Sequence, residues 1–215
     1  MVPLLNLCKR AFFLTKRGDF LLKKEYLRSL KQNTTVFWSM EHPLHLFGYC
    51  PRCGSNNFGT NDFKSKKCHD CGFVLYFNAL AATVAVIFNS RGELLVARRA
   101  KEPAKGTLDL PGGFIDSFET AEEGVAREVS EETGLSVASC EYLFSLPNKY
   151  IYSGFEEHTL DLFFACKVAD DTLPCANDDV EQLTWLPLDE VEPAQFGLQS
   201  IRNGVTRILE MYKKK

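Results

Sequence analysis

Residues 113–135 read GFIDSFETAEEGVAREVSEETGL, and within this stretch lie clear signals for the start and the end of a helix. Thr120 followed three residues later by Glu123 is a capping box, in which each residue's side chain can bind the other's backbone N–H. Gly134 is a typical residue just past a helix end. The stretch therefore predicts a helix over residues 121–133.

The same helix concentrates carboxylates on one side. At roughly 100° per residue, Glu128, Glu131 and Glu132 project within a third of the circumference. Like charges at this spacing repel each other, so the pattern suits either a solvated acidic face or a divalent cation site. Carboxylate oxygens are the hard ligands that Mg²⁺ and Mn²⁺ prefer.

The stretch resembles the Nudix box, G-x5-E-x7-R-E-U-x-E-E-x-G-U, at every defined position. The resemblance extends over residues 79–212. It implies an α/β fold, the Nudix α/β/α sandwich with a mixed sheet. It also implies hydrolysis of a nucleoside diphosphate linked to another moiety.

Roles follow from the resemblance, position by position. The ligands it implies for a catalytic Mg²⁺ or Mn²⁺ are Glu128, Glu131, Glu132 and the carbonyl of Gly113. Arg127 and Glu119 are expected to pair and so to hold the loop against the helix. Relatives often draw one more catalytic group from a late acidic residue, for which Glu181 is the first candidate and Asp178 and Asp179 are the next.

Two Cys-x-x-Cys pairs, fourteen residues apart, precede this region. The four residues are Cys50, Cys53, Cys68 and Cys71. Four thiolates at this spacing predict a tetrahedral, structural Zn²⁺ site with no open position for substrate, and four free or redox-active thiols are the alternative. We expect a zinc ribbon over residues 40–75 and a Nudix hydrolase domain over residues 76–215.

The first 39 residues differ in composition from the rest, with eight Lys or Arg against two Asp or Glu. They are predicted to be a basic N-terminal extension, either within the mature fold or outside it, and a transit peptide, a surface helix or sequence upstream of a start at Met40 would each fit. Because the net charge of the whole chain is -3, the remainder is acidic, which argues against general nucleic-acid binding. No apolar run reaches the ~18 residues of a membrane helix, so we expect no membrane partner. The expected location is cytoplasmic, or organellar if the extension is a transit peptide.

The remaining pattern predicts mainly strands. Residues 82–89 and 93–100 are expected to form a hairpin around a turn at residues 90–92. Further strands are expected within residues 141–146, 158–168 and 183–188, and a final amphipathic helix near residues 198–212.

A zinc ribbon before a Nudix domain resembles the NADH pyrophosphatase branch, which carries S-Q-P-W-P-F-P-x-S after the box. This chain has SLPNKYIYS at residues 145–153. The expected substrate-binding residues are Tyr150 and Tyr152, whose rings can stack on a base, and Pro147. The predicted substrate is an NADH- or NAD-like dinucleotide. ADP-ribose and diadenosine polyphosphates are the alternatives, and these three residues could instead only shape a loop.

Two further hypotheses concern partners. The Nudix domain could sense a nucleotide without catalysis, with the ribbon as a binding module. Removal of an NAD cap from RNA would need Lys64, Lys66 and Lys67 to line an RNA path. The expected partner is a small nucleotide, and a homodimer would match many proteins of this architecture.

Overall fold

The computed structural model describes residues 41–169, 174–177 and 179–212, except for the side chain of Tyr150. The predicted basic extension over residues 1–39 lies outside these described residues, and the expected domain boundaries stay a prediction. Within the described residues, no helix is long and apolar enough to cross a membrane.

The cysteine-rich segment forms a small antiparallel sheet. Its strands are β1 (Phe58–Asp62), β2 (Ser65–Cys68) and β3 (Val74–Tyr76), in the order β1-β2-β3. Phe58, Cys50 and Cys68 form its small buried cluster. So few apolar residues bury little surface, which is typical of a module stabilised by a metal.

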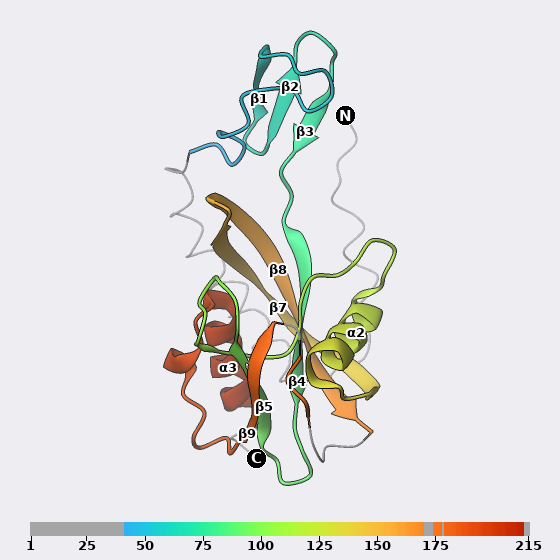
Figure 1. Cartoon of the computed structure of the whole chain (residues 1–215), viewed down its shortest axis with the longest axis vertical. Helices are drawn as coiled ribbons and strands as arrows, with labels where there is room; N and C mark the ends of the chain where they lie inside the picture. Colours follow the sequence, from blue (N-terminus) through green and yellow to red (C-terminus); the bar gives the residue numbers. More distant parts are fainter. Residues whose placement is uncertain (1–40, 170–173, 178, 213–215) are drawn as a thin grey trace, which may run out of the picture. The chain divides into compact units, whose positions relative to one another are not determined.

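The larger part of the chain is a three-layer fold. One sheet contains β4 (Leu80–Ile87), β8 (Phe155–Val168) and β7 (Val137–Tyr152), and the other contains β6 (Leu108–Asp109), β5 (Leu94–Arg99) and β9 (Val180–Leu186). The helices α2 (Ala121–Thr133) and α3 (Gln199–Tyr212) lie on opposite sides of the strands (Figure 1). Because β4 and β8 are parallel whereas β7 and β8 are antiparallel, the first sheet is mixed, and the predicted fold class is confirmed.

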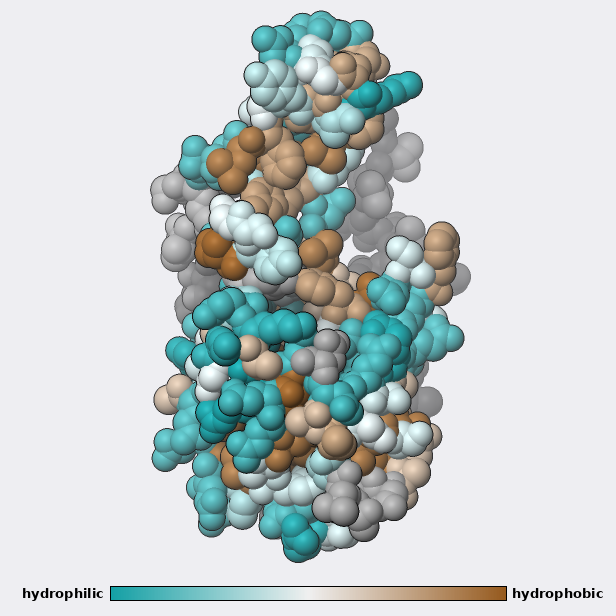
Figure 2. All heavy atoms as spheres, in the orientation of Figure 1, coloured by the Kyte–Doolittle hydropathy of each residue, from teal (hydrophilic) through white to brown (hydrophobic). Residues whose placement is uncertain are grey.

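Alternation along the strands divides the core into two halves. In β4, Val84 and Val86 pack in the cluster that contains Ile201 and Val205 of α3. Their neighbours in β4, Ala85 and Ile87, pack in the cluster with Val125 and Val129 of α2. Successive strand residues point to opposite faces, so one strand supports both helices. Hydrophilic side chains cover most of the visible surface over α2 and the loop between β5 and β6 (Figure 2).

The predicted hairpin at residues 82–100 is wrong in its pairing. Both strands exist, but β4 pairs with β8, and β5 pairs with β6 and β9. At the turn, their ends are joined by the isolated bridge between Phe88 and Leu94 and by a hydrogen bond of 3.0 Å from the Asn89 N–H to the Glu93 carbonyl. Both strands are buried on both faces, so their long-range partners decided the pairing and the short turn did not.

The SLPNKYIYS segment is a strand and not a loop. β7 and β8 form a long hairpin whose pairing runs from Val137↔Val168 to Tyr152↔Phe155. Side chains two residues apart on β7 therefore share a face of the sheet. This alternation decides which residues of the segment can reach a substrate.

Candidate active site

Helix α2 has the predicted bounds and caps. The Thr120 hydroxyl accepts a hydrogen bond from the Glu123 N–H at 3.2 Å, and the Glu123 carboxylate accepts one from the Thr120 N–H at 2.8 Å. Gly134 has φ +69° and ends the helix. Val125 and Val129 are fully buried against the sheet, which turns the carboxylates of the last two turns toward the sheet edge.

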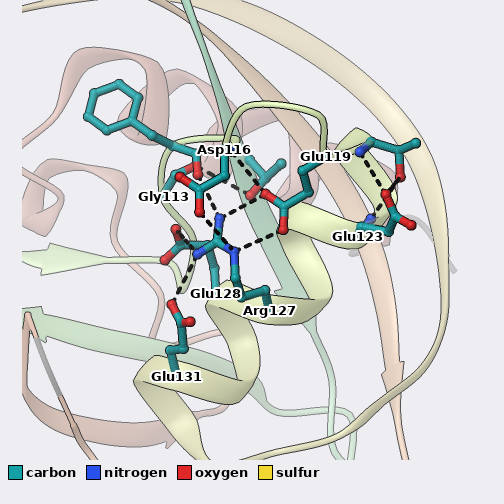
Figure 3. Close-up of polar contacts among 10 residues, drawn as sticks. Gly113, Asp116, Glu119, Glu123, Arg127, Glu128 and Glu131 are labelled. Atoms are coloured by element: carbon teal, nitrogen blue, oxygen red, sulfur yellow. Dashed lines mark hydrogen bonds and ion pairs between the residues drawn. The ribbon is translucent and has the colours of Figure 1, made fainter.

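Arg127 is the centre of the polar contacts beside this helix (Figure 3). Its guanidinium donates two hydrogen bonds of 2.9 Å to the carboxylate of Glu119, which is the expected pair. It also donates to Glu128 at 2.9 Å and to Glu131 at 3.0 Å. A fifth hydrogen bond, to the carbonyl of Phe114 at 3.0 Å, ties the loop to the helix. Because Arg127 also lies 3.8 Å from the Asp116 carboxylate, one cation contacts four carboxylates, and it holds the pKa of Glu119 below its usual value.

The loop before the helix runs against strand β4 at close range. The Gly113 carbonyl accepts a hydrogen bond of 2.8 Å from the Thr83 N–H and a longer one of 3.4 Å from the Thr83 hydroxyl. A Cβ atom at Gly113 would lie 2.6 Å from the carboxylate of Glu128. A Cβ atom at Gly112 would lie 2.1 Å from the Thr83 carbonyl oxygen. The approach therefore requires glycine at residue 112, whereas a Cβ atom at residue 113 would displace the Glu128 carboxylate.

Glu132 is buried among other acidic groups. Its carboxylate accepts a hydrogen bond of 2.9 Å from the Gly112 N–H. Burial, together with the negative charges of Glu128, Asp109 and Asp179, raises the pKa of Glu132 to about 8, and the hydrogen bond from the Gly112 N–H acts in the opposite direction. A bound divalent cation would favour the ionised carboxylate and so act against this shift.

A cavity of about 230 Å³ opens beside Gly112, Gly113 and Glu132. Five carboxylate residues line it but only one cationic residue, and these are Glu102, Asp109, Glu132, Asp161, Asp179 and Arg99. Arg99 is already paired with the buried Asp109. The cavity is therefore negative overall and attracts cations.

The acidic residues that follow the helix are placed differently from one another. Asp179 lines the cavity and pairs with Lys101, whereas Glu181 is exposed on β9 and is not among the lining residues. Asp178 lies outside the described residues. Asp179 is thus the described late carboxylate with access to the cavity.

The expected substrate-binding residues also separate. Tyr152 lines the cavity, whereas Pro147 is exposed and is not among the lining residues. The side chain of Tyr150 lies outside what the structure describes, although its backbone pairs with Glu157 in the hairpin.

Sequence reasoning missed several buried polar residues of the cavity, namely Thr83, Asp109, Asn148, Thr159 and Asp161. Burial raises the pKa of Asp161, and hydroxyls of Ser200 and Thr159 donate to its carboxylate. A signal for Asn148 was present, because strand alternation places it on the same face of β7 as Tyr152.

The four cysteine sulfurs of the ribbon converge. Their Sγ atoms all lie within 4.8 Å of one another, and Cys50 and Cys68 are buried. The backbone N–H groups of Cys71 and Asp70 lower the pKa of the Cys68 thiol to about 7. Thiolates that accept backbone N–H groups are the usual ligands of a structural zinc, so the residues fit Zn²⁺.

The oxygen donors beside α2 fit a hard divalent cation. Glu128 and Glu132 are largely buried, and Glu131 is more exposed. The Glu128 carboxylate lies close against the loop, because a Cβ atom at Gly113 would come within 2.6 Å of it. Carboxylates on one helix face, with the Gly113 carbonyl close to one of them, are oxygen donors of the kind that Mg²⁺ and Mn²⁺ prefer.

Comparison with known proteins places this geometry among relatives. The NUDIX domain family matches residues 78–206. The chain is 24% identical over 164 residues to the NAD-capped RNA hydrolase NudC of Pseudomonas aeruginosa (strain LESB58), which covers 76% of this chain and 55% of that protein. It is 32% identical over 123 residues to the ADP-ribose pyrophosphatase of Methanocaldococcus jannaschii, which covers 56% of this chain and 70% of that protein.

Among solved structures, the NUDIX hydrolase from Nitrosomonas europaea superposes with a TM-score of 0.61 at 19% identity, over 78% of this chain and 93% of that chain. This likeness shows a shared fold. The chain spans about half the length of the Pseudomonas relative that it matches.

Proposed function

The chain belongs to the Nudix family, and from this premise we propose that it is a metal-dependent hydrolase of the pyrophosphate in a nucleoside diphosphate-linked substrate. The preferred substrate class in this proposal is an NADH- or NAD-like dinucleotide.

One observation carries the proposal: Glu132 and Gly113 of the box line a cavity in which carboxylate residues outnumber cationic residues. A pyrophosphate would be repelled from such a cavity unless divalent cations accompanied it. A purely solvated acidic helix face would not bury Glu132 or fix Glu128 with an arginine. The arrangement therefore supports cation-assisted chemistry on a phosphate.

Glu128, Glu131, Glu132 and the Gly113 carbonyl would hold Mg²⁺ or Mn²⁺. When bound, the ion neutralises the phosphate oxygens and lowers the pKa of a bound water. Arg127 fixes the positions of Glu119 and Glu128 before substrate arrives, so less reorganisation is needed during the reaction. Asp179, at the cavity wall, is positioned to accept the proton of the attacking water, and this favours it over Glu181 for that role.

The variant Glu132→Gln tests the proposal. It removes a carboxylate but can keep the hydrogen bond from the Gly112 N–H, so we expect the melting temperature to be equal or higher. Hydrolysis should fall by roughly 10²- to 10⁴-fold. Glu122→Gln, an exposed change on the same helix, is the matched control. Unchanged hydrolysis in Glu132→Gln would overturn the proposed role of Glu132, and no hydrolysis by the folded, unchanged protein would favour a nucleotide sensor.

The substrate class is tested by turnover of NADH, NAD, ADP-ribose and diadenosine polyphosphates with Mg²⁺ or Mn²⁺. The name of the Pseudomonas relative supports an NAD-derived substrate, and the name of the Methanocaldococcus relative supports ADP-ribose. A clear preference for ADP-ribose would replace the dinucleotide proposal and keep the reaction class. No turnover of any of them by folded protein would overturn both.

NAD-capped RNA is a second candidate that the name of the Pseudomonas relative favours. Of the three lysines proposed to contact RNA, Lys66 is already engaged within the protein. Its ammonium donates to the Phe47 carbonyl at 2.5 Å and lies over the Phe58 ring. Lys66 is therefore buried within the ribbon, and Lys64 and Lys67 remain as candidates. Changing both lysines to alanine should lower the turnover of capped RNA and leave the turnover of NADH unchanged. If the variant turns over capped RNA as fast as the unchanged protein does, these lysines do not line an RNA path.

A further inference from the structure

The inner end of the cavity is a polar continuation of an apolar sheet face. Val84, Phe163 and Phe144 belong to the core cluster beneath α3. On the same face of β8, Asp161 comes two residues before Phe163, and Thr159 comes two residues before Asp161. Thr159 pairs directly with Asn148 of β7. Buried polar side chains in place of core residues need an explanation in hydrogen bonding.

Two of these polar groups satisfy each other. The Ser200 hydroxyl of α3 donates to one oxygen of the Asp161 carboxylate, and the Thr159 hydroxyl donates to the other, both at 2.5 Å. Both hydroxyl protons are thereby used. The cluster therefore presents acceptors to the cavity, because the carboxylate has no proton to give when ionised and the hydroxyl oxygens keep only lone pairs.

Asn148 is the group that the protein does not satisfy. Its side chain is 5% exposed and lines the cavity, and its Oδ1 atom is buried without a hydrogen-bond partner. A buried acceptor without a hydrogen bond lowers the stability of the fold, so buried acceptors usually have a donor from the protein, from water or from a ligand. Its neighbours Thr159 and Asp161 offer acceptors, so the oxygen lacks a donor that a molecule bound in the cavity, water included, would supply.

Apolar side chains also line the cavity, namely those of Ala82, Leu110, Val180, Leu198 and Ile201. Asp161 has both carboxylate oxygens bound by hydroxyl groups and repels a phosphate that arrives without a cation. A flat ring with an N–H group on its edge would suit both the apolar side chains and the unpartnered oxygen of Asn148.

We propose that Asn148 is a specificity-determining residue, which accepts a hydrogen bond from the NH₂ group carried by a flat nitrogen-containing ring of the substrate. The inference rests on the proposed dinucleotide hydrolysis, and it divides the substrate between two ends of the site. The pyrophosphate lies by the carboxylates of α2, and the ring with its NH₂ group lies between β7, β8 and α3. In a dinucleotide, the NH₂ group can be the amine of adenine or the carboxamide of nicotinamide.

The test compares kcat/KM for NAD with two analogues that each lack one NH₂ group. The hypoxanthine analogue replaces the adenine amine with a carbonyl, and the 3-acetylpyridine analogue replaces the carboxamide NH₂ with a methyl group. We expect the protein to disfavour one of the two by roughly 10- to 100-fold, because a buried acceptor loses its donor. The disfavoured analogue identifies which ring occupies the subsite.

The variant Asn148→Leu should reduce that discrimination to within about 3-fold, since leucine has no acceptor. Asn203→Leu makes the same chemical change at an exposed position of α3 and should keep the full discrimination. The melting temperature of Asn148→Leu should be no lower than that of the unchanged protein, because the substitution removes a buried orphan.

Four results would overturn the inference: equal use of all three substrates, discrimination that survives in Asn148→Leu, a preference for the hypoxanthine analogue, or a lowered melting temperature without a change in selectivity. If none of the dinucleotides is hydrolysed, the proposed function has failed, and the subsite is tested by equilibrium binding of AMP, IMP and nicotinamide mononucleotide. Two outcomes would support the subsite: tighter binding of AMP than of IMP, or binding of nicotinamide mononucleotide alone, provided that the preference is lost in Asn148→Leu. A binding preference that does not change in Asn148→Leu would overturn it.

Discussion

The substitution Gly113→Ala should displace the Glu128 carboxylate while it leaves the stability of the fold nearly unchanged. A Cβ atom at residue 113 would lie 2.6 Å from the carboxylate carbon and from both oxygens of Glu128. Ordinary contact between such atoms begins near 3.5 Å, so the carboxylate must retreat by about 0.9 Å. The carboxylate is the end of a flexible side chain, and it can retreat without moving the backbone.

The size of the expected loss follows from this displacement. Metal–ligand distances tolerate about 0.2 Å, and a misplacement of about 1 Å in a reacting assembly costs on the order of 10²-fold in rate. We therefore expect kcat to fall by roughly 10²-fold, which corresponds to about 2.7 kcal/mol. The 2.9 Å contact between Arg127 and Glu128 should lengthen as well.

The assay is hydrolysis of the best substrate at several Mg²⁺ concentrations, together with thermal unfolding. Stability should change by less than about 1 kcal/mol, because alanine also restricts the unfolded chain. Gly48→Ala, at a glycine with open space around its Cβ position, is the neutral control.

Gly112→Ala gives the contrasting result, because its Cβ would meet the backbone oxygen of Thr83 at 2.1 Å and its φ of +146° suits only glycine. That variant should lose about 3 kcal/mol or more of stability. Activity of Gly113→Ala within 3-fold of the unchanged protein would show that the position of Glu128 does not control the reaction.

Three further results are expected. Arg127→Lys keeps the charge but loses the two-pronged contact with Glu119, so apparent Mg²⁺ affinity in a titration of activity should weaken by roughly 10- to 100-fold, and an unchanged affinity would contradict the positioning role. Metal analysis should find one Zn²⁺ per chain. The variant Cys68→Ser should lose the zinc together with the dispersed amide signals of the ribbon in an NMR spectrum. The control Cys175→Ser, at an exposed cysteine outside the cluster, should keep both. In the turn before β5, Glu93 accepts hydrogen bonds from Arg91 and Asn89, which hold the pKa of its carboxyl below the usual value. The variant Glu93→Gln should therefore be less stable than the unchanged protein above about pH 4.5, and the difference in stability should vanish as the pH falls through the lowered pKa. A difference that persists at low pH in denaturant titrations would exclude the charge of Glu93 as its cause.

Local signals in the sequence determined the helix, the box and the ribbon. The helix over residues 121–133 has the predicted ends, because its capping box and its C-terminal glycine act within a few residues of chain. The convergence of the four cysteines is likewise set by two short turns and a three-stranded sheet. The family follows from the spacing of the box, and the domain match confirms it.

Only the tertiary structure decided which residues meet at the cavity. Strands β4 and β5 are neighbours in sequence but belong to different sheets, because each is buried on both faces and finds its partners far along the chain. For the same reason Asp179 and not Glu181 lines the cavity, and Asn148 lies buried where the sequence indicated only a departure from a family motif. The sequence by itself determined the chemistry of the carboxylates and thiolates, since short spacings carry it. The shape and polarity of the substrate end were decided by long-range strand register, which no local pattern encodes.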